Sequence, residues 1–272
     1  MTFSIVAHCP ESDSWGVAVA SKFLAVGSAV PAAIAGVGAL ATQAWANTGY
    51  KGQGLAFMDQ GASAGQALQQ LLAADADRDH RQVGIVDSTG QSASHTGAAC
   101  LDWAGGVTGP GYAIQGNILV GPQVVDAIEQ AWLTGSGQPI ADRLLAALAA
   151  GDGAGGDRRG RQSAALLVVC AGAGYGGFDD VAVDLRVDDH TDPVLELGRL
   201  LDLNDLYLTA TADADKVEID DALREEIESL ARAAGAIDFA AWVGTENYEM
   251  RVAEDFTWID RRILGIIRGH QE

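Results

Sequence analysis

Thr2 directly follows Met1, so removal of Met1 would leave a threonine as the first residue of the chain. The α-amine exposed in this way has a pKa of about 7.7–8.0 and is partly neutral near pH 7. A neutral amine beside its own hydroxyl can take the hydroxyl proton, so one residue supplies both the nucleophile and the base. Many proteins begin with Met-Thr for no catalytic reason, but here Thr2 begins a predicted strand. In this context the residue predicts hydrolysis of an amide by an N-terminal threonine.

Two further residues have side chains suited to that chemistry. Lys22 is one of three lysines in the chain and ends the segment WGVAVASK. An ammonium group near the amine of Thr2 would disfavour its protonated form; the alternative is a lysine whose stem covers the rim of a sheet. Asn117 follows Gly116 in YAIQGN, and its neutral amide could donate to the oxyanion of a tetrahedral intermediate. We expect Thr2, Lys22 and Asn117 to be catalytic.

Other polar residues lie next to apolar segments that are predicted to be strands. Binding sites are common at the edge of a sheet, where such strands end. Arg161 could hold a substrate carboxylate with two hydrogen bonds, and Asp157 could orient it. For each candidate the alternative is a turn-stabilising hydrogen bond or a surface charge. The expected substrate-binding residues are Ser21, Asn47, Asp157, Arg161, Gln162 and Ser163.

Some familiar patterns do not have the context that their chemistry requires. Residues 61–65, GASAG, match the nucleophile elbow GxSxG, but no buried apolar strand precedes them, so Ser63 is predicted to cap a helix. Histidines, cysteines and carboxylates lack the spacing of a zinc site, and the acidic run 188–192 is interpreted as a solvated turn rather than a cation site. No metal and no cofactor are expected.

Alternating and β-branched segments predict the elements that must position these residues. Strands are expected at 2–8, 15–22, 83–87, 91–95, 112–120, 163–170 and 181–187, and short buried strands rather than a helix at 26–46. Helices are expected at 53–74, 123–133, 139–150 and 193–203. Antiparallel hairpins with helices outside them indicate an α+β layered sandwich.

Composition excludes several classes of function. The formal net charge of −20 argues against binding to nucleic acid or to an anionic membrane surface. No apolar run reaches the roughly 18 residues of a membrane helix, and no secretory signal is recognisable. The three cysteines, Cys9, Cys100 and Cys170, are widely spaced, which suits a reducing compartment. We expect a cytoplasmic protein, and a homo-oligomer because enzymes of this size are commonly symmetric assemblies.

The sequence resembles a bacterial family known as domain of unknown function 1028. The resemblance is carried by the first 31 residues and by ATQAWAN, DRDHRQVGIVD, TGAAC, YAIQGNILVG, GGDRRGRQSAALLVV and VDLRVDDHTDPVLEL. It implies a four-layer αββα sandwich of the N-terminal-nucleophile hydrolase type over residues 1–208, with Thr2 at the nucleophile position. It does not imply a substrate.

Residues 213–272 are acidic, and their apolar residues recur with the period of a helix. We predict a separate small helical unit there. Helices are expected at 216–234, 237–242 and 258–267. The segment FAAWVGTENYEMR resembles a small module described as peptidoglycan-binding. Trp242 and Tyr248 could stack on a sugar, or could instead belong to a core or an oligomer interface.

These observations predict an amidohydrolase that cleaves a C–N bond in a small molecule or short peptide after loss of Met1. The alternative is a non-catalytic binding or scaffold protein that retains the fold. That protein could associate with the cell wall through residues 213–272.

Overall fold

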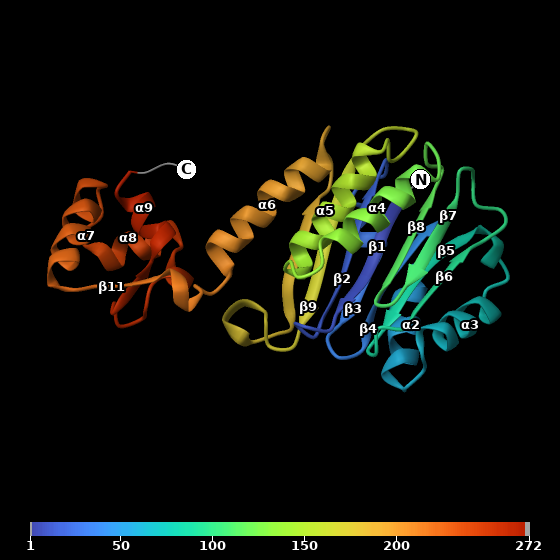
Figure 1. Cartoon of the computed structure of the whole chain (residues 1–272), viewed down its shortest axis with the longest axis horizontal. Helices are drawn as coiled ribbons and strands as arrows, with labels where there is room; N and C mark the ends of the chain where they lie inside the picture. Colours follow the sequence, from blue (N-terminus) through green and yellow to red (C-terminus); the bar gives the residue numbers. More distant parts are fainter. Residues whose placement is uncertain (1, 270–272) are drawn as a thin grey trace. The chain divides into compact units, whose positions relative to one another are not determined.

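A hairpin formed by β1 (Thr2–Cys9) and β2 (Ser14–Ser21) lies at the centre of the first sheet in a computed structural model that describes residues 2–269 (Figure 1). All residues of both strands are buried. The other strands of this sheet are β7 (Gly105–Gly109), β8 (Tyr112–Asn117), β9 (Ser163–Cys170) and β10 (Val181–Val187). Their order is β10-β9-β2-β1-β8-β7, and all neighbours are antiparallel.

The second sheet has the order β3-β4-β5-β6 and is also antiparallel. Its strands are β3 (Pro31–Ile34), β4 (Gly38–Ala44), β5 (Arg81–Asp87) and β6 (Ser92–Thr96). The tight connection from β5 to β6 contains Gly90 at φ 79°, a conformation that glycine adopts without strain.

An apolar core lies between the two sheets. Val6, Val17 and Val19 of the first sheet belong to one buried cluster with Ala41 and Val86 of the second. Because successive side chains of a strand point to opposite faces, every second residue of each strand faces this core. The alternation fixes which polar side chains enter the space between the sheets.

Helices pack on the two sheets, α4 and α5 on the first and α2 and α3 on the second (Figure 1). Their bounds are α4 (Gln123–Thr134), α5 (Ile140–Gly153), α2 (Gly49–Asp59) and α3 (Ala64–Ala74). Gly151 of α5 allows close approach to Ile128 of α4, since a Cβ there would lie 2.6 Å from Ile128 Cγ1. The protein is thus a mixed α/β structure built from helices and antiparallel sheets.

Three local predictions are corrected by the structure. Residues 26–46 are not all strand, because α1 (Val26–Ala29) precedes β3. The helix expected at 53–74 is two helices, and Ser63 forms a capping box with Gln66 at the start of α3, which confirms it as a helix cap. Strand β7 was not predicted, because its sequence GGVTG is rich in glycine, which has a low strand propensity.

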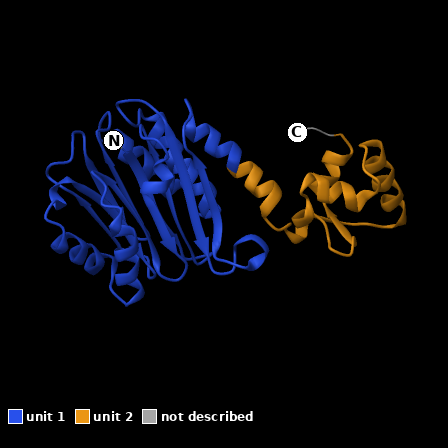
Figure 2. Ribbon diagram, turned by 180° about the vertical axis from the view of Figure 1, so that it is seen from behind, with its two compact units in different colours: residues 1–200 blue, residues 201–272 orange. Residues whose placement is uncertain are grey.

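The chain divides into two compact units, residues 1–200 and 201–272 (Figure 2). The division falls inside α6 (Pro193–Leu208), whereas the sequence placed a boundary at 208–213. The second unit contains α7 (Asp221–Ala233), α8 (Phe239–Glu246) and α9 (Arg261–Ile267). It also contains an unpredicted pair of short strands, β11 (Lys216–Glu218) and β12 (Trp258–Asp260).

Trp242 and Tyr248 belong to the core of the second unit. Both are buried, and their rings lie 5.3 Å apart in a cluster that includes Phe239 and Ile259. Because a ring that stacks on a sugar must present a face to solvent, neither residue is available for this role, and their part is in packing.

Candidate functional site

Four polar residues form one row across neighbouring strands at the end of the first sheet. Thr2 of β1 pairs with Asn117 of β8 on one side and with Ser21 of β2 on the other. Ser21 pairs in turn with Ser163 of β9. All four residues were predicted to be functional, and all four are buried. The antiparallel registers therefore bring together residues that are up to 161 positions apart in the chain.

The hydroxyl of Thr2 contacts a second hydroxyl. Thr2 Oγ1 lies 3.0 Å from Ser21 Oγ, and the Thr2 residue is 6% exposed. The carbonyl of Thr2 accepts a hydrogen bond of 3.3 Å from Nε2 of Gln43, which comes from the other sheet. The position of Thr2 is thus fixed by its strand neighbours and by the facing sheet.

Buried amides behind Thr2 connect the two sheets. Gln82 Oε1 accepts from Asn117 Nδ2 at 2.9 Å and from Gln43 Nε2 at 2.8 Å. Ser4 Oγ donates to Gln43 Oε1 at 2.7 Å and accepts from Gln115 Nε2 at 2.6 Å. Since buried polar groups need partners, these bonds make the orientation of each amide depend on that of its neighbours.

Three glutamines of this network were not predicted as site residues: Gln43, Gln82 and Gln115. The signal was a single glutamine within each of three apolar strands, in ATQA, RQVGIVD and YAIQGN. A buried glutamine in a strand needs several hydrogen-bond partners, so one in each strand indicates a shared network. Gly84 is part of this arrangement, because a Cβ there would overlap the side chain of Gln115.

The backbone N–H of Lys22 contacts the carboxylate of Asp157. The N–H of Lys22 donates to Asp157 Oδ2 at 2.7 Å, and Lys22 Nζ donates to the carbonyl of Arg161 at 3.3 Å. Asp157 also accepts from the N–H of Arg159 at 2.8 Å. The Lys22 ammonium group is therefore bonded to the 161 carbonyl, while the carboxylate of Asp157 holds the end of β2.

Ser163 also holds the segment after β2. Its hydroxyl donates to the carbonyl of Phe23 and accepts from the N–H of Val26 at 3.1 Å. The N–H of Ala25, a residue with φ 53°, donates to the carbonyl of Asp188 at 2.9 Å. The segment that carries Phe23 is thus fixed at several points.

Arg161 and Gln162 lie in a separate shallow polar depression that they share with Lys22, Asp189 and His190. The guanidinium of Arg161 is held by Asp152, at 2.9 Å from Nε and 2.8 Å from Nη2, and this pairing raises the pKa of Arg161. Gln162 Nε2 donates to Asp189 Oδ1 at 3.0 Å. Both side chains are therefore already paired with carboxylates of the chain.

Asn47 belongs to a third cluster, centred on Asp75. Asp75 Oδ2 accepts from Asn47 Nδ2 at 3.1 Å, from the Tyr50 hydroxyl at 2.8 Å and from Arg81 Nε at 2.9 Å. The hydrogen bond from Arg81 is the main cause that lowers the pKa of Asp75, while burial raises the pKa of Tyr50. Asn47 Oδ1 also accepts from the N–H of Gly49, at the start of α2. Asn47 thus joins this helix to the β5 end.

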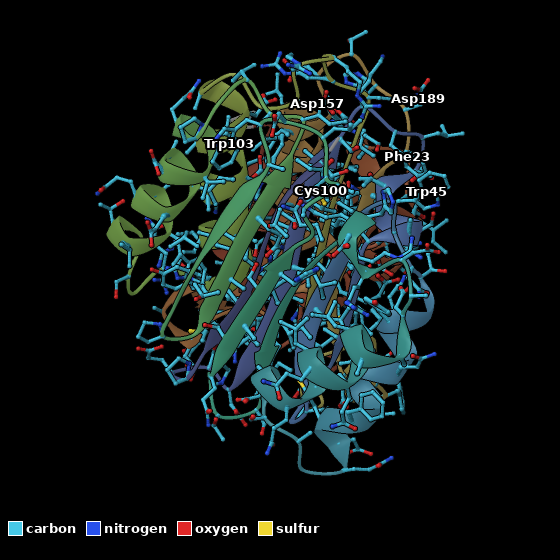
Figure 3. The ribbon with its side chains drawn as sticks, turned by 90° about the vertical axis from the view of Figure 1, so that its right-hand side faces the viewer. Phe23, Trp45, Cys100, Trp103, Asp157 and Asp189 are labelled. Atoms are coloured by element: carbon cyan, nitrogen blue, oxygen red, sulfur yellow. The ribbon has the colours of Figure 1, made fainter. Side chains whose placement is uncertain are left out.

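A cavity of about 660 Å³ opens beside the polar row. Asn117 lines it, and Phe23, Trp45 and Cys100 lie at the same end of the sheets (Figure 3). The remaining lining residues are Ala29, Ala44, Ala46, Thr48, His80, Ala99, Leu101 and Ile118. Burial raises the pKa of the Cys100 thiol, so the cysteine contributes to the wall as a small neutral group. The walls of the cavity are thus mainly apolar.

Two residues of the cavity wall adopt left-handed backbone conformations. Ala44 ends β4 at φ 66°, and Ile118 follows β8 at φ 51°. Such a conformation is unfavourable for a β-branched residue. Hydrogen bonds hold the chain here, since the N–H of Ile118 donates to the carbonyl of Leu101 at 2.9 Å. Strained residues of this kind are typical of functional sites.

Among the residues 2–269, no group of three or more His, Cys, Asp or Glu side chains is arranged to hold a metal ion. No helix in the described part of the chain is long and apolar enough to cross a membrane.

The fold and site define a mixed α/β protein with a row of buried polar residues at the end of one antiparallel sheet, beside an apolar cavity. Residues 2–197 match a family described as a family of unknown function, DUF1028, and the chain belongs to that family. The crystal structure of protein SPO2555 from Silicibacter pomeroyi, of the same family, is similar to this chain. The two are 32% identical with a TM-score of 0.68, covering 78% of this chain and 90% of that chain. A search of curated proteins found no match.

Proposed function

We propose that this protein is an N-terminal-threonine amidohydrolase of the N-terminal-nucleophile type, with a four-layer αββα arrangement. The observation that carries the proposal is the position of Thr2. Its hydroxyl lies 3.0 Å from Ser21 Oγ at the end of a buried strand, directly opposite Asn117. A hydroxyl fixed between polar neighbours and beside a cavity suits a nucleophile, because the attacking atom is positioned before substrate binds.

In the proposed reaction, loss of Met1 frees the α-amine of Thr2. The amine takes the proton of Oγ1, and Oγ1 attacks the carbonyl carbon of the amide. The C–N bond then breaks, the amine product leaves with the proton, and an ester on Thr2 remains. Water hydrolyses this ester and regenerates the hydroxyl. Ser21, which contacts Oγ1 directly, positions the hydroxyl during both steps.

Asn117 is the proposed donor to the oxyanion. One of its two amide hydrogens is used by Gln82 Oε1, which fixes the side chain and leaves the second for the substrate. A donor of this kind that is held before the reaction stabilises the developing negative charge without rearrangement. We place Lys22 at the edge of the site, where its ammonium group contributes a positive charge through space.

One contact favours the alternative of a non-catalytic binding protein. Lys22 Nζ donates to the Arg161 carbonyl, whereas the described contact of Thr2 Oγ1 is with Ser21. Under this alternative the cavity binds a ligand and Thr2 has only a structural role.

The intact mass of the purified protein and an activity screen separate the two functions. Loss of one methionine, together with hydrolysis of small amides by the wild type and none by Thr2→Ala, is the expected result. Met1 retained on all molecules, or equal hydrolysis by Thr2→Ala with the fold intact, would leave the binding function.

A further inference from the structure

The cavity beside Asn117 differs in composition from the rest of the protein. Charged residues make up 20% of the chain, yet none of the described residues that line the cavity is Asp, Glu, Lys or Arg. Transfer of a charge into such surroundings is strongly unfavourable unless a partner is present. The lining therefore selects against charged groups.

The exposure of large apolar side chains at the cavity is also unusual. Trp45 is 75% exposed, Leu101 is 66% exposed and Phe23 is 53% exposed. The segment that carries Phe23 is fixed by Asp157 and Ser163 through the contacts described above. The chain thus holds apolar surface open to solvent at a defined place, which is typical of a ligand site.

The size and polarity of the cavity indicate what could occupy it. A volume of about 660 Å³ lies within the range of small-molecule sites. Its polar lining residues include Asn117, which pairs with Thr2 across β1 and β8. A ligand would therefore place a polar group at Asn117 and apolar atoms along Phe23, Trp45 and Leu101.

From this arrangement we propose a substrate class: neutral amides whose aliphatic or aryl group enters the cavity and carries no charge. This inference rests on the proposed hydrolase function. A substrate carboxylate bound by Arg161 is not part of this class, because the guanidinium of Arg161 is already paired with Asp152.

Binding is measured by calorimetry on the full-length Thr2→Ala variant, which cannot turn the probes over. The probes are acetyl, butyryl and hexanoyl p-nitroanilide, and adipoyl p-nitroanilide as a six-carbon chain with a terminal carboxylate. Affinity is expected to rise about fourfold per added methylene until the cavity is filled. The adipoyl probe is expected to bind no better than the acetyl probe.

Leu101→Glu introduces a charge at the cavity wall, and Leu133→Glu introduces the same charge on an exposed part of α4. The first variant, made in the Thr2→Ala background, should lose about tenfold in affinity for the hexanoyl probe. The second should change it by less than about twofold. Both positions are exposed, at 66% and 51%, so neither change disturbs the core.

Affinity that is independent of chain length, or equal for hexanoyl and adipoyl probes, would overturn the inference. Absence of binding, with self-association that Leu101→Glu abolishes, would overturn it too and assign this surface to a second copy of the chain. Release of p-nitroaniline by the wild type tests the hydrolase separately. Binding that depends on chain length without release of p-nitroaniline would support the selectivity of the cavity and contradict the hydrolase function. Release with a kcat/KM that is independent of chain length would support the hydrolase function and contradict the selectivity of the cavity.

Discussion

Asn117 faces Thr2 across the β1–β8 strand pair while its amide donates to Gln82 of the opposite sheet at 2.9 Å. The residue proposed to stabilise the oxyanion is thus connected to both sheets. Because Gln82 also accepts from Gln43, which donates to the carbonyl of Thr2, the nucleophile and the oxyanion donor share one network. The site and the packing of the two sheets depend on the same buried amides.

Replacement of the proposed nucleophile should remove activity without unfolding the protein. Thr2→Ala deletes Oγ1 and its contact with Ser21, which costs about 1 kcal/mol of stability. We expect amide hydrolysis to fall by at least about a thousandfold, and Thr2→Ser to retain part of it. Hydrolysis rates and thermal unfolding of the purified variants test this. A Thr2→Ala protein with the wild-type rate would contradict the role of Thr2.

Loss of the amide of Asn117 should slow the reaction more than it weakens substrate binding. Removal of one donor to an oxyanion typically lowers kcat by about 10²–10³. Asn117→Ala is therefore expected to lower kcat by this factor with KM nearly unchanged. Steady-state kinetics on a folded variant provide the measurement. A variant with unchanged kcat and a raised KM would instead make Asn117 a substrate-binding residue.

Gln82 should be important for stability. Gln82→Met would leave Asn117 Nδ2 without its acceptor, whereas Gln43 Nε2 would keep its bonds to the carbonyls of Thr2 and Gln115. One unsatisfied buried group costs about 1–3 kcal/mol. We expect a clear fall in the free energy of unfolding, measured with urea. Gln69→Met on the exposed face of α3 is the matched control and should have little effect. Equal stability of the two variants would show that the network contributes nothing.

The cluster around Asp75 should make stability depend on pH. Its hydrogen bonds, above all from Arg81, lower the pKa of Asp75 in the folded chain below its ordinary value of 3.8. The unfolded chain therefore binds the proton more readily, so this stabilisation is complete above about pH 4 and is lost as the pH falls through the folded-state pKa.

Asp75→Asn removes the charge at every pH and is the matching variant. The difference in urea midpoint between wild type and Asp75→Asn should be large near pH 7 and smaller near pH 3. A difference that stays constant over this range would mean that the ion pair with Arg81 does not stabilise the fold.

The local elements could be predicted from the sequence because their causes are local. Alternating or β-branched segments predicted β1, β2 and β9, and Ser63 was predicted to cap a helix, as it does at the start of α3. Thr2 was predicted from its residue type, from its position at the start of a strand and from the family resemblance. A strand rich in glycine, such as β7, lacks the alternating pattern and was missed.

The composition of the site depended on the tertiary structure, because strand register and sheet packing bring distant residues together. Register placed Asn117, Thr2, Ser21 and Ser163 in one row. The same packing separated Asn47 from this row and placed it beside Asp75. It also paired Arg161 with Asp152. Residue type and spacing thus determined which side chains could do chemistry, whereas the contacts between the two sheets determined which of them meet.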